Sequence, residues 1–231
     1  MPHHAELPLW NDKSDAQKTE TMRRMIDDLY EVIYAEARRN LRKILENAKP
    51  GDDKERADIA TMRDLLEKYP NIMSPNCEVG HFTGSALVCD NEGRVLLHYH
   101  KNLKRWLQFG GHADTEMDLA DVAMRESIEE TGLEWLRHYP VKKQEPVPID
   151  FDIHTIPENK NRPEHLHLDV RYMMMTSYPD SLNPPEGESK DFIWAKFDEF
   201  LNPTDPADAE LLDPSLRRLI KKCRDRYHNL I

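Results

Sequence analysis

The spacing of apolar residues divides the chain into a helical first part and a strand-rich second part. Before about residue 70, apolar residues recur at three- and four-residue steps, which is the period of an α-helix. One long helix is predicted over residues 15–48, ended by the segment KPGD at 49–52, and a second over 54–68, stopped by Pro70. The apolar positions of the first helix are Met22, Met25, Ile26, Leu29, Ile33, Ala37, Leu41, Ile44 and Leu45.

The apolar stripe of the first helix has two interpretations. It could form the seam of a homodimer, or it could pack against the second helix or against the domain that follows. The sequence favours neither, so both stay open at this point.

From about residue 79 the pattern changes to short segments typical of strands. Residues 81–90 and 94–100 are separated by Asn91-Glu92-Gly93 and predict a hairpin. Three more strands are predicted, and a closing helix is expected over 207–229, interrupted or capped near Asp213-Pro214. Strands with a central and a terminal helix favour a mixed sheet between helical layers. The three further strands are 147–156, 165–176 and 191–197.

The strand predicted over 165–176 carries polar residues on one side. Because side chains alternate along a strand, His165, His167, Asp169 and Arg171 share a face. With His154 on a neighbouring strand, the histidines could line a substrate pocket or bind a transition metal. A solvent-facing or hydrogen-bonded histidine is the commoner role on a strand.

The segment 111–133, GHADTEMDLADVAMRESIEETGL, is the most informative part of the chain. Its helix carries Arg125, Glu126, Glu129 and Glu130, with apolar residues on two sides, so it is expected to pack between layers. Three carboxylates beside a buried stripe repel one another and lose hydration unless something compensates them. A bound Mg²⁺ or Mn²⁺ is the natural compensation, since hard cations take oxygen ligands.

Both ends of this helix are marked. Thr115 and Asp118 have the spacing of a capping box, and Gly132 follows the last turn, where a left-handed residue ends a helix. Gly110 and Gly111 before the helix allow close approach of the backbone to a ligand. Arg125 precedes Glu129 by four residues, so the two can pair.

Composition excludes some classes of function. The 231 residues suffice for one sizeable domain with an appendage. A net charge of −11 argues against nucleic-acid and membrane-surface binding, although it leaves a nucleotide substrate open because a metal supplies local positive charge. No apolar run reaches membrane-spanning length and the N-terminus lacks signal-peptide features. Cys77, Cys89 and Cys223 lack metal-site spacing, so free thiols and a cytoplasmic location are expected.

The glycine and glutamate pattern resembles the Nudix box, G-x5-E-x7-R-E-U-x-E-E-x-G-U, in which U is aliphatic. Seven positions are in register, whereas Met117 replaces the first glutamate and Ser127 an aliphatic residue. A WLQ-x-GGHAD stretch at 106–114 extends the resemblance to roughly 79–200. It implies an α/β fold, an α/β/α sandwich with a mixed sheet. The domain is expected over 79–231, after a helical extension over 1–78. The matching positions are Gly111, Arg125, Glu126, Glu129, Glu130, Gly132 and Leu133.

The resemblance also implies chemistry: Mg²⁺-dependent hydrolysis of a nucleoside diphosphate linked to another group, with Mn²⁺ as the alternative ion. By motif position, Gly111, Glu126, Glu129 and Glu130 are expected to hold metal, and Glu126, Glu129 and Arg125 to be catalytic. Arg105, His112 and Arg171 are expected to bind substrate.

Two questions stay open. The general base is either a box glutamate or a loop residue, for which Glu186 and Glu188 are candidates. Met117 and Ser127 favour an alternative function, a nucleotide-binding or regulatory module with little or no catalysis. The intact glutamates favour the enzyme.

Overall fold

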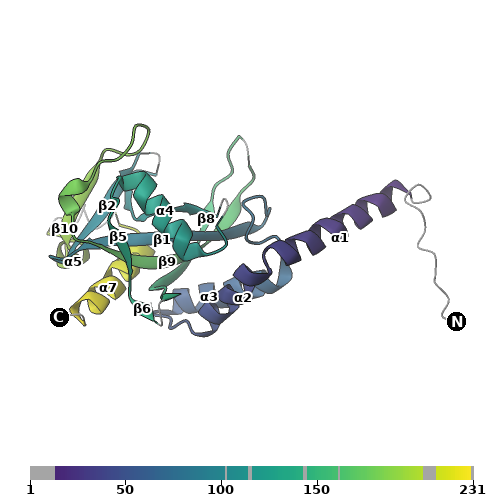
Figure 1. Ribbon diagram of the computed structural model, residues 1–231, viewed down its shortest axis with the longest axis horizontal. Helices are drawn as coiled ribbons and strands as arrows, with labels where there is room; N and C mark the ends of the chain where they lie inside the picture. Colours follow the sequence, from purple (N-terminus) through teal and green to yellow (C-terminus); the bar gives the residue numbers. More distant parts are fainter. Residues whose placement is uncertain are drawn as a thin grey trace.

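The computed structural model describes residues 14–101, 103–113, 116–142, 145–160, 162–204 and 212–229 (Figure 1). Its first part holds three helices, α1 (Asp15–Ile33), α2 (Ala35–Glu46) and α3 (Asp53–Lys68). The prediction of one helix over 15–48 is therefore wrong, because the chain leaves helical geometry at Tyr34, with φ −97° and ψ 8°. The break falls where burial begins: α1 buries no residue, whereas α2 buries four.

The two interpretations of the apolar stripe each apply to a part of it. Figure 1 shows α1 extending away from the body of the molecule, while α2 and α3 lie against it. Leu41 and Leu45 of α2 and Met62 and Leu66 of α3 are buried in the same hydrophobic core as the strands. The second helix is confirmed, with Asp52 as its N-cap. Because α2 and α3 share this core, the boundary at residue 78 stays a prediction.

The predicted strands are confirmed as β1 (Gly80–Asp90), β2 (Arg94–His100), β8 (Asp150–Ile156), β9 (His165–Thr176) and β10 (Phe192–Lys196). The described residues place them in one sheet of order β10-β2-β1-β9-β5, in which β8 pairs with β9. β1 and β9 are parallel and the other pairs are antiparallel, so the sheet is mixed. Strands that the sequence did not predict are β3 (Arg105–Leu107), β4 (Phe109–His112), β5 (Leu136–Tyr139) and the separate pair β6 (Val141–Lys142) and β7 (Glu145–Pro146).

Helices cover both faces of the sheet. Phe82 and Val88 of β1 face a core that contains the apolar side chains of α4 (Leu119–Thr131). Leu87 and Cys89 of the same strand face a second core, formed with α5 (Phe197–Leu201) and α7 (Pro214–His228). This alternation confirms the α/β/α sandwich.

The closing helix α7 is capped near Asp213-Pro214, as predicted. It begins at Pro214, where the Asp213 side chain accepts a hydrogen bond from Ser215 N at 2.8 Å, as the capping prediction required. Residues 205–211 lie outside the described residues. None of the helices in the described ranges has the length and apolar character needed to cross a membrane. The three cysteines are buried free thiols, as expected.

Candidate active site

Helix α4 is fixed at both ends. The predicted capping box placed Asp118 inside the first turn, but Asp118 is itself the extended N-cap, accepting from Ala120 N at 2.8 Å, so the helix begins later than predicted. Thr115, the expected N-cap, lies outside the described residues. Gly132 ends the helix with a φ of 68°, and a Cβ there would lie 2.0 Å from the backbone oxygen of Asn183. Glycine is therefore required at this position.

The polar residue at the aliphatic position of the box is accommodated inside the helix. Ser127 is fully buried, and its hydroxyl donates to the carbonyl of Ala123 at 2.7 Å. A buried hydroxyl with this partner avoids most of the cost of desolvation. Ser127 is thus compatible with a packed box helix.

The carboxylates of α4 lie against the glycines of β4. Gly110 N donates to Glu130 Oε2 at 3.1 Å. A Cβ added to Gly111 would lie 2.2 Å from Glu126 Oε1, so only glycine allows this approach. The structure therefore brings together the backbone and carboxylate groups that were predicted to hold metal.

Arg125 connects the carboxylates to one another. Its Nη1 donates to Glu126 Oε1 and to Glu129 Oε2, both at 2.9 Å, and its Nη2 donates to the carbonyl of His112 at 2.8 Å. Its Nε donates to Glu116 Oε1 at 2.5 Å. Glu116 precedes Met117, so a carboxylate contacts Arg125 from beside the position where the box glutamate is missing.

The electrostatics of this group indicate missing positive charge. Burial, and then the charges of Glu126, Glu188 and Glu129, raise the pKa of Glu130 to about 8, although the Gly110 N–H opposes this. Oxygen donors with excess negative charge fit a hard divalent cation. Glu188 lies on the loop that the sequence singled out, and its charge reaches Glu130.

A second polar group lies on the sheet face opposite α4. Residues of β9 at even positions, such as Leu168 and Val170, join the α4 core, so His165, His167 and Arg171 point the other way. Rings of His81, His112 and His154 lie within 5.4 Å of the His167 ring, centroid to centroid. The sequence indicated His165, His167 and His154, but His81 was missed because β4 and the β1–β9 register were not predictable.

Burial keeps two of these imidazoles neutral. Burial, followed by the charge of His112, lowers the pKa of His81 to about 3. Burial and the charges of His81 and His154 lower the pKa of His167 to about 2. Neutral imidazoles can accept hydrogen bonds or ligate metals.

The two arginines predicted to bind substrate occupy different surroundings. Arg105 on β3 is half-exposed, with Nη1 3.4 Å from Asp213 Oδ2. Arg171 is buried, and it donates to Asp169 Oδ2 and Asp152 Oδ2 at 3.0 Å. The structure does not bring Arg171 into contact with the carboxylates of α4.

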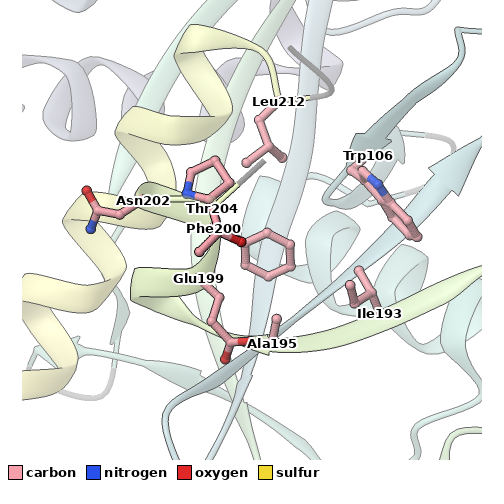
Figure 2. A pocket seen from close by; sticks show the side chains of 9 residues that line it. Trp106, Ile193, Ala195, Glu199, Phe200, Asn202, Thr204 and Leu212 are labelled. Atoms are coloured by element: carbon pink, nitrogen blue, oxygen red, sulfur yellow. The ribbon is translucent and has the colours of Figure 1, made fainter. Parts of the chain in front are cut away.

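A pocket of about 530 Å³ lies beside β10 and α5. Figure 2 shows Trp106 and Ile193 on one side of it and Phe200 near its centre. Trp106 also packs at 5.4 Å, edge-on, against Tyr99. Among the described residues that line this pocket there is no carboxylate of α4, and there is no lysine or arginine that could bind a diphosphate.

Comparisons with known proteins assign the family. The NUDIX domain profile matches residues 81–215, more than half of the chain. A NUDIX-family hydrolase from Clostridium perfringens is similar, with 25% identity and a TM-score of 0.46 over 63% of this chain and 96% of that chain. An Ap4A hydrolase binary complex from C. elegans has 16% identity and a TM-score of 0.47, with coverage of 64% and 98%. The MutT protein from Methanosarcina mazei Go1 has 18% identity and a TM-score of 0.42, with coverage of 64% and 94%. No curated protein matches. The profile match and the box residues on α4 show that the chain belongs to the NUDIX family and is a hydrolase that acts on diphosphate linkages.

Proposed function

We propose that this protein is a Mg²⁺-dependent pyrophosphohydrolase that cleaves the diphosphate linkage of a nucleoside diphosphate joined to another group. The observation that carries the proposal is the carboxylate group on α4. Glu130 and Glu126 lie against Gly110 and Gly111, and Arg125 joins Glu126 to Glu129. Burial, followed by the charges of neighbouring glutamates, raises the pKa of Glu130.

Glu126, Glu129, Glu130 and the carbonyl of Gly111 would hold the metal, with Mn²⁺ as the alternative ion. The ion supplies Lewis acidity toward the diphosphate oxygens and toward the attacking water. Arg125 fixes the directions of Glu126 and Glu129 by donating to both. Preorganised carboxylates of this kind avoid reorganisation during the reaction.

Glu188 is the favoured general base. It is exposed on a loop, and its charge helps to raise the pKa of Glu130, which supports a position near the carboxylate group. The water oxygen forms the new bond to phosphorus, the bridging P–O bond breaks, and Glu188 takes the proton of the water. Nothing equivalent supports Glu186.

Two predicted residues keep a proposed role in substrate binding. The carbonyl of His112 accepts from Arg125 Nη2, which brings its backbone beside the diphosphate position, while its ring packs with His81 and His167 on the opposite face. Arg105 is exposed and can exchange Asp213 for a phosphate oxygen. Arg171 would act indirectly: it holds Asp169, which accepts from Ser85 Oγ at 2.7 Å and from Gln108 Nε2 at 3.3 Å.

A panel of nucleoside diphosphate derivatives tests this proposal. The full chain is incubated with each compound and Mg²⁺, and products are identified by phosphorus NMR, with a chelator as the control. We expect cleavage of the diphosphate with at least one class of compound, and no cleavage with the chelator. Tight binding of the same compounds without turnover would instead support a nucleotide-binding or regulatory module.

We also propose that α1 mediates a homodimer. Its large apolar side chains are exposed, and four of them line a shallow surface hollow. Light scattering should show two chains per particle for the full chain and one for a shortened chain that begins at Tyr34, with activity retained. The same number of chains in both would contradict a dimer formed by α1. Removal through Asp52 should be more damaging, because it deletes Leu41, Leu45 and the N-cap of α3. The apolar residues lining the hollow are Met22, Met25, Ile26 and Leu29.

A further inference from the structure

Three histidines on the face opposite α4 have the arrangement of a metal site. His81, His165 and His167 each offer a ring nitrogen, and these nitrogens lie within 4.8 Å of one another. His81 is fully buried and His165 nearly so. They come from the first residues of the parallel strands β1 and β9, where His81 is opposite His167 in the register. Two adjacent strands therefore hold the group rigidly.

Hydrogen bonding leaves nitrogens of this group available. His165 Nδ1 lies 2.9 Å from the carbonyl of Pro163, to which only a protonated nitrogen can donate, so Nε2 carries the lone pair. A backbone carbonyl behind a ligating imidazole is the usual outer-sphere partner of metal-bound histidine. His81 Nε2 is buried, and no described residue forms a hydrogen bond with it.

The spacing of a further pair is also compatible with a cation. His112 Nε2 and His167 Nε2 are 3.2 Å apart. Two nitrogens bound to one tetrahedral Zn²⁺ at about 2.0–2.1 Å are about 3.4 Å apart. His112 is thus the fourth imidazole of the group, while its backbone carbonyl accepts from Arg125.

The guanidinium of Arg162 lies beside the three histidines. Arg162 Nη2 lies 3.3 Å from His81 Nδ1, and a guanidinium can only donate. Ligation through His81 Nε2 places the imidazole proton on Nδ1, so this contact must be released. Arg162 retains the carbonyl of Cys77, which accepts from the same nitrogen at 2.9 Å.

We propose that His81, His165 and His167 form a second metal site, separate from the carboxylates of α4, that binds a first-row transition ion such as Zn²⁺. Imidazole selects ions of this class, whereas Mg²⁺ prefers carboxylate and water oxygens. Three protein ligands leave a coordination position for water, a small molecule or His112. The proposal does not rest on the proposed function, because none of the three residues belongs to the box.

Cobalt spectroscopy tests the site with the full chain. Co²⁺ is titrated in saturating Mg²⁺, so that the carboxylates are already occupied, and visible absorption reports imidazole coordination. We expect one Co²⁺ per chain that Mg²⁺ does not displace and Zn²⁺ does. His165→Ala and His167→Ala should each weaken binding by at least about 100-fold, more than outer-sphere partners contribute. The exposed His228→Ala is the matched control and should bind as the parent does.

Several outcomes would overturn the site. These are an absence of Co²⁺ binding in saturating Mg²⁺, equal affinity in the histidine variants, and a thiolate charge-transfer band, which would make Cys77 the ligand. Glu126→Gln should leave the cobalt spectrum unchanged, so failure of the carboxylate site is distinguishable. Thermal unfolding guards against misfolded variants: Zn²⁺ should raise the melting temperature of the parent and of His228→Ala, but not of His165→Ala. Arg162→Gln should bind Co²⁺ at least as tightly as the parent, because a competing cation is removed.

Discussion

Two groups of carboxylates lie on opposite faces of the same sheet, and they differ in what neutralises them. Next to α7, Asp150, Asp152 and Asp169 are buried, and arginines and lysines of the chain contact every one of them. At α4, Arg125 pairs with Glu126, Glu129 and the preceding Glu116, whereas no cation of the described residues forms an ion pair with Glu130. The buried aspartates are neutralised by cations of the chain, whereas Glu130 is the carboxylate for which we propose a cation from solution.

The pKa values of one member from each group show this difference. Burial alone would raise the pKa of Asp152, but His154, Arg171 and Lys54 hold it below its usual value. Burial raises the pKa of Glu130, and the neighbouring glutamates raise it further. In these two residues the shift follows the neighbouring charges: cations lower the pKa of Asp152, whereas glutamates add to the rise in the pKa of Glu130.

The largest expected effect comes from breaking the neutralised group. Arg171→Met leaves Asp169 and Asp152 without a partner that contacts both, and breaking a buried pair costs about 3–5 kcal/mol. Urea unfolding should show this loss, while Mg²⁺ affinity of the folded protein stays unchanged. The exposed Arg137→Met serves as the control. A loss below about 1 kcal/mol, the size of a surface pair, would contradict a structural role.

The opposite result is expected on α4. Glu126→Gln should lower kcat by about 10²–10³-fold, the usual cost of losing one preorganised electrostatic group. Stability without metal should be equal or higher, because a repelling charge is removed. Steady-state kinetics and urea unfolding measure the two effects, with the exposed Glu134→Gln as the control. Destabilisation with an unchanged kcat would show that the glutamates are structural.

The sequence could predict contacts between residues that are close along the chain, but not contacts between residues that are far apart. Within α4, Arg125 and Glu129 are four residues apart, so local helical spacing predicted their pairing. The left-handed Gly132 that ends the helix is a local signal too. The carboxylate site was therefore within reach of sequence reasoning.

The neutralised group was not predictable, because its partners are distant in sequence. Arg218 contacts Asp150 at 2.8 Å, and Lys222 pairs with Glu55, which is 167 positions away. Alternation correctly placed Arg171 and Asp169 on one face of β9, but from Leu168 onward both faces of the strand are buried. A polar stripe on such a strand does not reveal whether it faces substrate or a partner from another element.

The third prediction concerns the pH dependence of the metal-free protein. The pKa of Glu130 is about 8 when folded, against 4.5 as its ordinary value. Between these values the unfolded chain releases a proton that the folded chain keeps, so stability should fall as pH rises from about 4.5 to about 8.

Urea midpoints across this range, compared with Glu130→Gln, isolate the contribution of this group. The variant should lack that part of the decline. Saturating Mg²⁺ should reduce the decline in the parent, because a bound cation favours the ionised carboxylate. Parallel curves for parent and variant would show that Glu130 is not the group that titrates.

The smallest effects are expected at the position where the box departs from its pattern. Glu116 Oε1 accepts a hydrogen bond from Arg125 Nε at 2.5 Å, whereas Met117 is exposed before the helix begins. Glu116→Gln should lower kcat roughly tenfold, the lower end of what outer-sphere partners contribute. Met117→Glu should raise kcat by only about twofold, within the range of surface changes. Turnover at saturating Mg²⁺ measures both. Activity that appears only in Met117→Glu would mean that Glu116 does not replace the missing glutamate, and that the parent chain binds its ligand without hydrolysing it.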